Sequence, residues 1–468
     1  MRPFELTLSI LAIFTALVFF LPKTLTRWKS RILPIVLGLA ALAQITLEGF
    51  RWQLWPLMIA TLLLVLLELT KKEGQGNKLL TSLALILVLI SIAGAVVFPV
   101  PDPFPMTGPY QVGTREIHLI DPSRNEIYGT DPSAPREFMA QIWYPAKPGS
   151  ADQQAQWMPD IKYAAPAIAE KLNLPSFTLG HLKYVLANAF LEAEPIQDGS
   201  TFPVLIFSHG WEGFKEQNIY QVEELASHGY VVIGISHTYG SMVTVFPDGR
   251  QVPTNQDALP DGVSDDAYDR ASNLLVQQWA GDIVWTLDEL ESMDQESSVW
   301  FLSGKVDLDR VGVFGHSTGG GAAVEFCLVD ERCQAIFGMD VWAEPALPEI
   351  LELHLTQPAL ILLSESWYSP NESDRNYELI GTLAERAESD VDEIALIGTR
   401  HYDFTSLPLL TPLAAQLGLK GPIPGTLGLE IINAETVAFF DKYLKGDKSI
   451  NLEKISNQYP EALWIVRP

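Results

Sequence analysis

A serine within a short glycine-rich stretch has the surroundings of a catalytic nucleophile. Residues 315–319 read Gly-His-Ser-Thr-Gly, which matches the pattern Gly-x-Ser-x-Gly with Ser317 at its centre. The apolar run 311–314 comes directly before this pentapeptide, and a helix-forming run, 322–326, follows it. This order predicts a sharp strand-to-helix turn that holds the Ser317 hydroxyl exposed at the edge of a sheet. The alternative is a glycine-rich turn whose serine only caps a helix.

The serine hydroxyl needs a base, and the sequence offers two histidines for this role. The hydroxyl is a weak nucleophile at neutral pH unless a histidine, itself held by an acid, can take its proton. On such turns the acid and then the histidine follow the serine along the chain, and only His354 and His401 come after Ser317. His401 comes just after the last apolar strand, whereas His354 lies in an amphipathic run that favours a helix. We therefore predict that His401 is the base.

Two carboxylates are candidates for the acid that orients this histidine. Asp340 ends the apolar run 335–339, one strand after the serine, and Glu365 ends the next run, 359–364. Both would emerge at the carboxyl edge of a parallel sheet, where the active sites of such folds lie. The layout of the sequence alone does not choose between them.

Two backbone amides are expected to stabilise the negative oxygen that develops during ester hydrolysis. The amide of Thr318, directly after the serine, is one candidate, and the second should come from the loop after the apolar run 204–208. This loop, 209–213, reads His-Gly-Trp-Glu-Gly. Gly210 permits an unusual backbone turn, which makes the amide of Trp211 the expected second donor.

Histidines earlier in the chain are interpreted as structural. His209 and His237 each follow an apolar strand but precede Ser317, which is the wrong order for the base. We expect their rings to bond to the backbone. The proposed chemistry requires no metal ion and no cofactor, so the sequence is expected to bind neither.

Buried strands that alternate with helices provide a scaffold for these side chains. Six continuous apolar runs have the length of buried strands: 204–208, 230–236, 311–314, 335–339, 359–364 and 393–397. Helical segments separate them, including 271–292 and 430–444. This alternation indicates a mostly parallel sheet with helices on both faces, the α/β-hydrolase fold of the α/β class. Earlier strands are expected at 116–120 and 139–144, followed by a more helical stretch, 161–193, that is a lid or merely packing.

The first hundred residues predict about four membrane helices. Their apolar runs are 6–21, 32–45, 54–69 and 79–97. Several approach the ~20 residues that a spanning helix needs, and the shortness of the second leaves three spans as an alternative. Lysines and arginines fill the first and third connections, at 23–31 and 71–78, whereas Arg51 alone lies in the second. Basic connections face the cytoplasm, so everything after residue 101 is expected outside.

We therefore expect a transmembrane region at 1–100 and an extracytoplasmic catalytic domain at 101–468. A cleaved signal peptide is the alternative for residues 1–22, but only Arg2 is basic there before the apolar run, and no small-residue cleavage pattern follows it. Transport or lipid sensing by the helices is a further alternative. Their few acidic residues lie near the ends of the apolar runs, which favours anchoring.

The net charge and the two cysteines bear on which partners the protein binds and on which cellular compartment it occupies. The chain has a net charge of −26, although its first hundred residues carry nine Lys or Arg against four Asp or Glu. Such an acidic surface repels nucleic acid, so no nucleic-acid partner is expected. The two cysteines, Cys327 and Cys333, both lie in the expected extracytoplasmic domain. They form either a disulfide there or two buried thiols, because spacing alone does not show the Cα approach that a disulfide requires.

The domain after residue 101 resembles the platelet-activating factor acetylhydrolases, the lipoprotein-associated phospholipase family. The resemblance runs from about residue 110 to 445. It rests on Trp-Tyr-Pro at 143–145, Pro-Val-Leu-Ile-Phe-Ser-His-Gly at 203–210, Leu-Ala-Ser-His-Gly-Tyr-Val-Val at 225–232, Val-Phe-Gly-His-Ser-Thr-Gly-Gly at 313–320, Gly-Met-Asp-Val-Trp at 338–342, and His401 with Asp403 and Phe404. The Met-Asp-Val-Trp element is the discriminating one.

This resemblance implies that the acid lies one strand after the serine, at Asp340 rather than Glu365. It also implies a calcium-independent esterase that removes short or oxidised acyl chains from phospholipids. The sequence departs from the family in its four apolar segments, in the bulky Trp211 at the oxyanion position, and in Thr318, where an aromatic residue is expected beside the nucleophile.

The sequence thus predicts a membrane-anchored serine ester hydrolase. Ser317 is the expected nucleophile, His401 the base and Asp340 the acid, with Trp211 and Thr318 as amide donors. The expected partners are a lipid or small ester substrate and the membrane itself. Two other functions stay open: a polyester or dienelactone-type hydrolase, which would show the same Gly-His-Ser-x-Gly-Gly pattern, and a catalytically inactive binding module anchored in the membrane.

Overall fold

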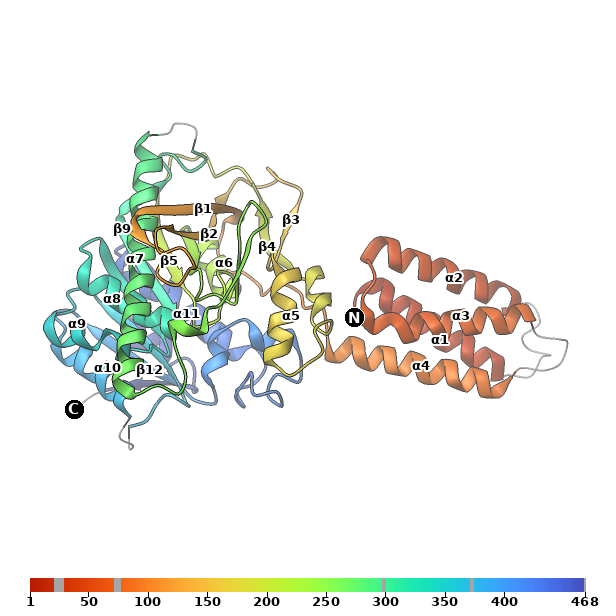
Figure 1. Cartoon of the computed structure of the whole chain (residues 1–468). Helices are drawn as coiled ribbons and strands as arrows, with labels where there is room; N and C mark the ends of the chain where they lie inside the picture. Colours follow the sequence, from red (N-terminus) through yellow and green to blue (C-terminus); the bar gives the residue numbers. More distant parts are fainter. Residues whose placement is uncertain (21–28, 71–76, 297–299, 371–373, 467–468) are drawn as a thin grey trace. The chain divides into compact units, whose positions relative to one another are not determined.

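The computed structural model describes residues 1–20, 29–70, 77–296, 300–370 and 374–466, which form two compact units (Figure 1). The first unit comprises Met1–Asp102, Ala165–Val185 and Leu409–Leu413, and the second comprises the rest. The domain expected at 101–468 included both of these later segments. The structure instead groups them with the N-terminal helices.

The first unit contains four helices, one on each predicted apolar run: α1 (Pro3–Phe20), α2 (Lys29–Glu48), α3 (Trp55–Thr70) and α4 (Lys78–Val97). Among the described residues, three segments are long and apolar enough to cross a membrane: Pro3–Phe20, Trp52–Thr70 and Lys78–Val97. The apolar part of α2, Ile32–Glu48, is shorter. Four of the basic residues behind the predicted topology lie outside the described residues: Lys23, Arg27, Lys71 and Lys72.

Polar contacts tie the helix ends of the first unit together. Arg51 and Glu5 form a fully buried ion pair at 2.6 Å, and Arg51 also donates to the carbonyl of Phe98 just after α4. A buried pair of this kind fixes an arrangement more than it adds stability. The indole of Trp52 donates to the carbonyl of Thr178 at 2.9 Å, so the Ala165–Val185 segment is held at the same helix ends.

One sheet of eleven strands forms the centre of the second unit, in the order β13-β12-β11-β10-β9-β5-β6-β2-β1-β4-β3. The strands are β1 (Gln111–Asn125), β2 (Pro135–Ala146), β3 (Gln154–Gln156), β4 (Leu186–Leu191), β5 (Phe202–Ser208), β6 (Val231–Ser236), β9 (Val306–His316), β10 (Cys333–Met339), β11 (Ala359–Ser364), β12 (Val391–Leu396) and β13 (Ala462–Ile465). The six strands from β12 to β6 are parallel, and β13 and β2 flank them antiparallel. This confirms the predicted mostly parallel sheet.

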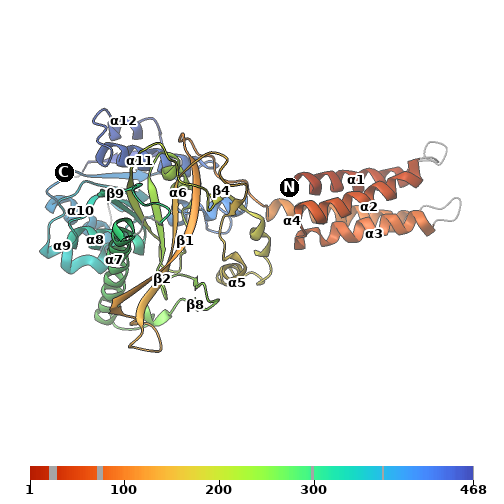
Figure 2. The same cartoon turned by 90° about the horizontal axis from the view of Figure 1, so that it is seen from above.

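Helices cover both faces of this sheet, and Figure 2 shows α11 and α7 on opposite sides of β9. Along β9, Phe314 contacts Phe440 of α11, whereas Val313 belongs to the core cluster with Trp279 of α7. This alternation is the side-chain period of a strand that is buried on both faces. The helices wholly within the unit are α6 (Ile219–Ser227), α7 (Asp265–Glu296), α8 (Thr318–Val329), α9 (Leu347–Glu352), α10 (Arg375–Arg386), α11 (Leu427–Tyr443) and α12 (Leu452–Ser456). Helix α5 (Ile161–Lys171) begins in this unit, and its residues from Ala165 onward belong to the first unit. A short ribbon, β7 (Val243–Val245) with β8 (Gln251–Pro253), lies apart from the main sheet.

The strand register aligns the carboxyl ends of β5, β9, β10 and β11. Ser208 pairs with Gly315, and Met339 pairs with both His316 and Leu362. The residues that follow these strands therefore emerge next to one another at one edge of the sheet. This register explains why Ser317 and Asp340 lie at the same edge of the sheet.

Two helical predictions are wrong in part. In the stretch 161–193, only Ile161–Lys171 is α-helical, and β4 occupies Leu186–Leu191. The sequence of β4, Leu-Ala-Asn-Ala-Phe-Leu, contains no β-branched residue, so its local preference is not that of a strand, and pairing with β1 and β3 decides its conformation. The run around His354 is not a helix face either, because α9 ends at Glu352.

Candidate active site

Ser317 stands on a strained turn between β9 and α8. Its backbone has φ 56° and ψ −122°, a conformation that costs a non-glycine residue of order 1–3 kcal/mol. The amide donates to the carbonyl of Met339 at 3.0 Å, and its carbonyl accepts from the amides of Gly321 and Trp342 at 3.1 Å. The Ser317 side chain makes no helix-capping bond, which argues against the capping interpretation.

The two glycines of the pentapeptide are required by close packing. A Cβ atom at Gly315 would lie 2.3 Å from the carbonyl oxygen of Gly319. A Cβ atom at Gly319 would lie 2.2 Å from the carbonyl oxygen of Ser208. Because no side chain fits at either position, the turn can form only with glycine at both, as a nucleophile turn on a sheet edge requires.

His401 lies directly against the acid that the sequence favoured. It begins the short 3-10 helix His401–Phe404 after β12, and its Nδ1 lies 2.9 Å from Oδ2 of Asp340. Its ring stacks on Trp367, with centroids 4.7 Å apart and an interplanar angle of 8°. The imidazole is therefore held in one orientation by a carboxylate and an aromatic face.

Asp340 is fully buried and accepts three hydrogen bonds. Besides His401, the amide and hydroxyl of Ser364 donate to its two oxygens at 2.6 and 2.7 Å. Burial raises the pKa of Asp340, although the His401 and Ser364 bonds oppose this effect. Glu365, the other candidate, is exposed and accepts from the amide of Gly398. The structure therefore brings Asp340, and not Glu365, to His401.

Ser317 and His401, the expected nucleophile and base, share no hydrogen bond among those of the described residues. Within the described ranges, the Ser317 hydroxyl has no hydrogen-bond partner. The ring of His316, the residue before Ser317, nevertheless lies 4.4 Å from that of His401, and His316 Nε2 lies 3.1 Å from the His401 carbonyl. Hydrogen bonds between catalytic groups are often long without substrate and shorten in the reacting complex. His354, by contrast, is exposed and lies 3.0 Å from the carbonyl of Arg386.

The loop 209–213 packs against Ser317, the expected nucleophile. A Cβ atom at Gly210 would lie 3.3 Å from the Cβ of Ser317, so Trp211 comes next to the nucleophile turn. Glu212 has φ 56°, and its amide donates to the carbonyl of Gly240 at 2.9 Å. Thr318 is the first residue of α8, where a backbone amide has no acceptor within the helix and the helix dipole is positive.

Sequence reasoning missed Gln217, which joins this loop to the nucleophile turn. Its amide oxygen accepts from the amide of Gly210 at 3.2 Å, and its amide nitrogen lies 3.1 Å from Nδ1 of His316. Burial, with the nearby His401, holds the pKa of His316 well below its usual range, so its ring is neutral. No motif contains Gln217, so no local sequence signal marked it as part of the site.

His209 bonds to the backbone, as a structural histidine does. Its Nδ1 lies 2.7 Å from the carbonyl of Gly210, and its Nε2 lies 2.8 Å from the hydroxyl of Ser241. Cys327 and Cys333 form a disulfide in the structure, with Cα atoms 5.2 Å apart. Among the described residues, no group of three or more His, Cys, Asp or Glu side chains could hold a metal ion.

Comparisons with known proteins agree with the fold and the predicted family. The family model described as platelet-activating factor acetylhydrolase, isoform II, matches residues 102–458. A platelet-activating factor acetylhydrolase of Cavia porcellus is 26% identical over 368 residues, which cover 74% of this chain and 78% of the relative. A probable 1-alkyl-2-acetylglycerophosphocholine esterase of Arthroderma benhamiae is 23% identical over 414 residues, which cover 80% and 97%.

A solved structure supports the fold independently. The ferulic acid esterase from Streptomyces cinnamoneus superposes with a TM-score of 0.62 at 23% identity, and the match covers 79% of this chain and 100% of that one. This likeness confirms the α/β-hydrolase fold. The family match identifies the chain as a carboxylic ester hydrolase, and it begins at residue 102, after the four helices. The chain therefore belongs to the family of platelet-activating factor acetylhydrolase, isoform II.

Proposed function

We propose that this chain hydrolyses short or oxidised acyl esters of phospholipids with Ser317, His401 and Asp340 as a catalytic triad. The observation that carries the proposal is the 2.9 Å contact between His401 and the buried Asp340, next to a serine on a strained turn. Membership of a family of ester hydrolases supports the same chemistry.

In this mechanism the Ser317 hydroxyl attacks the ester carbonyl while Nε2 of His401 accepts its proton. Asp340 accepts a hydrogen bond from Nδ1–H, which leaves Nε2 free as the base and stabilises the imidazolium that forms. The same nitrogen returns the proton to the leaving alcohol, and water then hydrolyses the acyl-enzyme. The amides of Trp211 and Thr318 stabilise the oxyanion in both steps.

The names of the relatives and the aromatic side chains of the site support this substrate class. Two matched relatives are named for platelet-activating factor or 1-alkyl-2-acetylglycerophosphocholine, in which the cleaved acyl group is acetyl. Partly buried tryptophans accompany each part of the present site: Trp211 in the oxyanion loop, Trp342 two residues after Asp340, and Trp367 against His401. Such rings suit a short apolar acyl group and the glycerol ester next to it.

We further infer that the N-terminal helices anchor the enzyme in a membrane with its catalytic domain outside the cytoplasm. Three helices have the length and composition of spanning segments. The basic residues between the apolar runs favour cytoplasmic first and third connections. The Cys327–Cys333 disulfide suits an oxidising compartment.

The test uses the full-length protein in detergent and two phosphatidylcholines that differ only in the acyl group at position 2. We expect the acetyl ester to be cleaved about tenfold faster than the hexadecanoyl ester, or more. Ser317→Ala should abolish turnover and labelling by a fluorophosphonate while its melting temperature stays that of the wild type. A wild-type protein that neither cleaves an ester nor takes the label would contradict the proposal and favour an inactive binding module.

A further inference from the structure

A second group of serine, histidine and aspartate side chains lies next to the oxyanion loop. Nε2 of His237 is 2.9 Å from the hydroxyl of Ser208, and Nδ1 is 2.9 Å from Oδ2 of Asp282. The connectivity is that of a catalytic triad, yet all three side chains are fully buried, so no substrate can reach the hydroxyl. We propose that Ser208, His237 and Asp282 form a positioning triad that holds the oxyanion loop, residues 209–213, against the nucleophile. This inference rests on the proposed function.

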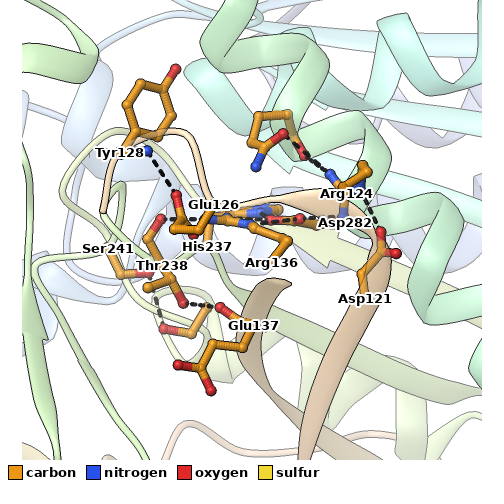
Figure 3. A network of polar contacts seen from close by, with 12 residues as sticks. Asp121, Arg124, Glu126, Tyr128, Arg136, Glu137, His237, Thr238, Ser241 and Asp282 are labelled. Carbon is orange, nitrogen blue, oxygen red and sulfur yellow. Dashed lines mark hydrogen bonds and ion pairs between the residues drawn. The ribbon is translucent and has the colours of Figure 1, made fainter. Parts of the chain in front are cut away.

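Asp282 provides the fixed end of this triad. Figure 3 shows Arg124, Arg136 and His237 converging on its carboxylate, with Arg136 Nη2 at 2.6 Å and Arg124 Nη2 at 2.8 Å. Burial alone would raise the pKa of Asp282, but the charge of Arg136, with the bonds from His237 and Arg136, brings the pKa well below its usual range. Arg136 in turn pairs with Glu126 at 2.6 Å. The carboxylate is therefore ionised and cannot rotate without breaking several charged contacts.

The ionised carboxylate determines which nitrogen of His237 carries the proton. Burial lowers the pKa of His237, so the ring is neutral and has one N–H. That N–H lies at Nδ1 and donates to Asp282, which leaves Nε2 to accept from the Ser208 hydroxyl. The ring is also stacked on Trp279, with centroids 4.2 Å apart and an interplanar angle of 5°. Ser208 is thus bound to a ring that has one allowed orientation.

Further contacts transmit this position to the oxyanion loop. The backbone amide of His237 donates to Nε2 of His209 at 3.3 Å. The chain just after His237 also holds the far end of the loop, because the amide of Glu212 donates to Gly240 and the amide of Met242 donates to Gly213. Both ends of the loop are therefore tied to the segment that His237 begins.

Ser208 packs so closely against the turn of the nucleophile that its position affects the geometry of the site. The carbonyls of Ser208 and His209 would lie 2.2 and 2.4 Å from a Cβ atom at Gly319, the last residue of the pentapeptide turn 315–319. A displaced Ser208 would therefore shift the loop relative to Ser317. An oxyanion donor must lie within hydrogen-bond distance of the developing charge. A small shift of the loop therefore reduces stabilisation of the transition state more than it reduces substrate binding.

The test compares two variants that each remove one buried serine hydroxyl. Ser208→Ala removes the bond to His237, and the control Ser456→Ala removes a 2.7 Å bond to Glu435 on α11, away from the site. With the acetyl phosphatidylcholine as substrate, we expect Ser208→Ala to lower kcat about tenfold, less than the roughly 100-fold loss on deletion of a whole oxyanion donor, and to leave KM within about twofold. Ser456→Ala should leave both constants unchanged.

Hydrogen exchange of the full-length protein gives a readout that does not depend on activity. The amides of residues 209–213 should exchange faster in Ser208→Ala than in the wild type, and at the wild-type rate in Ser456→Ala. Unchanged exchange and kcat in Ser208→Ala would overturn the inference, as would an equal loss of kcat in both variants. If the wild type cleaved no ester, the proposed function would fail, and the exchange rates alone would decide whether the triad holds the loop.

Discussion

At the scale of single residues, the site combines its chemistry with backbone conformations that side chains rarely adopt. Ser317, Asp340 and Glu212 have φ values of 56°, 42° and 56°, and none of them is glycine. Each such residue costs free energy, which neighbouring contacts must offset. The amide of Asp340 donates to Leu362 at 2.8 Å, and its carboxylate accepts twice from Ser364. Three of the six non-glycine residues with positive φ among the described residues are therefore the proposed nucleophile, the proposed acid and a residue of the loop 209–213.

Replacing the acid by its amide should keep His401 in place but change which of its ring nitrogens carries the proton. In Asp340→Asn the new side-chain amide donates to Nδ1 of His401, which forces the proton onto Nε2 and removes the lone pair that accepts the Ser317 proton. We expect kcat to fall by about 10⁴, the size of this effect in a serine protease, with little change in KM. Steady-state kinetics on a short p-nitrophenyl ester would measure it.

Glu365→Gln is the matched control for this substitution. Glu365 also follows a strand of the same sheet edge, but its carboxylate is exposed and bonds only to a backbone amide, that of Gly398, among the hydrogen bonds described. We expect its kcat to equal that of the wild type, because Asp340, and not Glu365, is bonded to His401. A large loss in Glu365→Gln with full activity in Asp340→Asn would reverse the assignment of the acid.

The sequence could point only to site residues that lie in a motif or have a fixed place in the chain order, and not to residues whose contacts arise from the fold. Ser317 and His401 followed from the pentapeptide and from the order of the chain. The choice between Asp340 and Glu365 needed the family resemblance, because both end buried strands. Gln217 carries no local signal, since its two bonds join segments that only the folded sheet brings together.

At the scale of elements, α8 links Ser317, the proposed nucleophile, to the next strand of the sheet, β10. The helix begins directly after Ser317 and ends just beyond Cys327, which is joined by a disulfide to Cys333 at the start of β10. A disulfide across a short loop stabilises mainly by restricting the unfolded chain. The disulfide should therefore affect stability and not the reaction at Ser317, which lies at the opposite end of the helix.

Removal of the disulfide should therefore affect stability and leave catalysis intact. We expect Cys327→Ala with Cys333→Ala to lower the free energy of unfolding by about 2 kcal/mol, as a loop of this length implies. Denaturant unfolding would measure the loss, and kcat at 25 °C should equal that of the wild type. A variant that is as stable as the wild type would show that the bond adds no stability here.

A buried carboxyl on α8 should make stability depend on pH. Burial, with the charge and hydrogen bond of nearby Glu349, raises the pKa of Glu325 from 4.5 to about 8. Between these values the folded protein holds a proton that the unfolded chain has released, so the free energy of unfolding falls as pH rises through this window. Glu325→Gln removes this ionisation and should be more stable than the wild type at pH 8.5 by at least about 1 kcal/mol, the value of one pKa unit.

Thermal melting of both proteins at pH 5 and pH 8.5 would check this prediction. The difference in melting temperature should be largest at pH 8.5 and shrink toward pH 5, where the wild-type carboxyl is protonated in the folded state. Parallel pH dependences in the two proteins would mean that Glu325 does not titrate in this window.

The fold was predicted best where strands are apolar on both faces. Runs such as 204–208 and 359–364 lie within β5 and β11, because a strand buried on both sides is apolar throughout. Strand β4 was missed, since its sequence lacks β-branched residues and its pairing with β1 depends on a partner more than seventy residues earlier. Local sequence preferences do not contain such a partner.

At the scale of the whole molecule, the chain combines an apolar unit with an acidic one. The first hundred residues carry a basic excess, whereas the whole chain has a net charge of −26. An acidic domain is repelled by anionic headgroups, so it gains nothing from the membrane surface by charge alone. Spanning helices can hold such a domain near lipid substrates in spite of this repulsion.

Cysteine labelling in intact cells would test which side of the membrane the catalytic domain occupies. In the Cys327→Ala and Cys333→Ala background, Ser449→Cys adds a thiol on an exposed turn near the C-terminus, and Thr24→Cys adds one in the first connection. The basic residues of that connection favour the cytoplasm, so a membrane-impermeant maleimide should label Ser449→Cys in intact cells and Thr24→Cys only after permeabilisation. The opposite pattern would place the enzyme in the cytoplasm, in contact with a different pool of lipid.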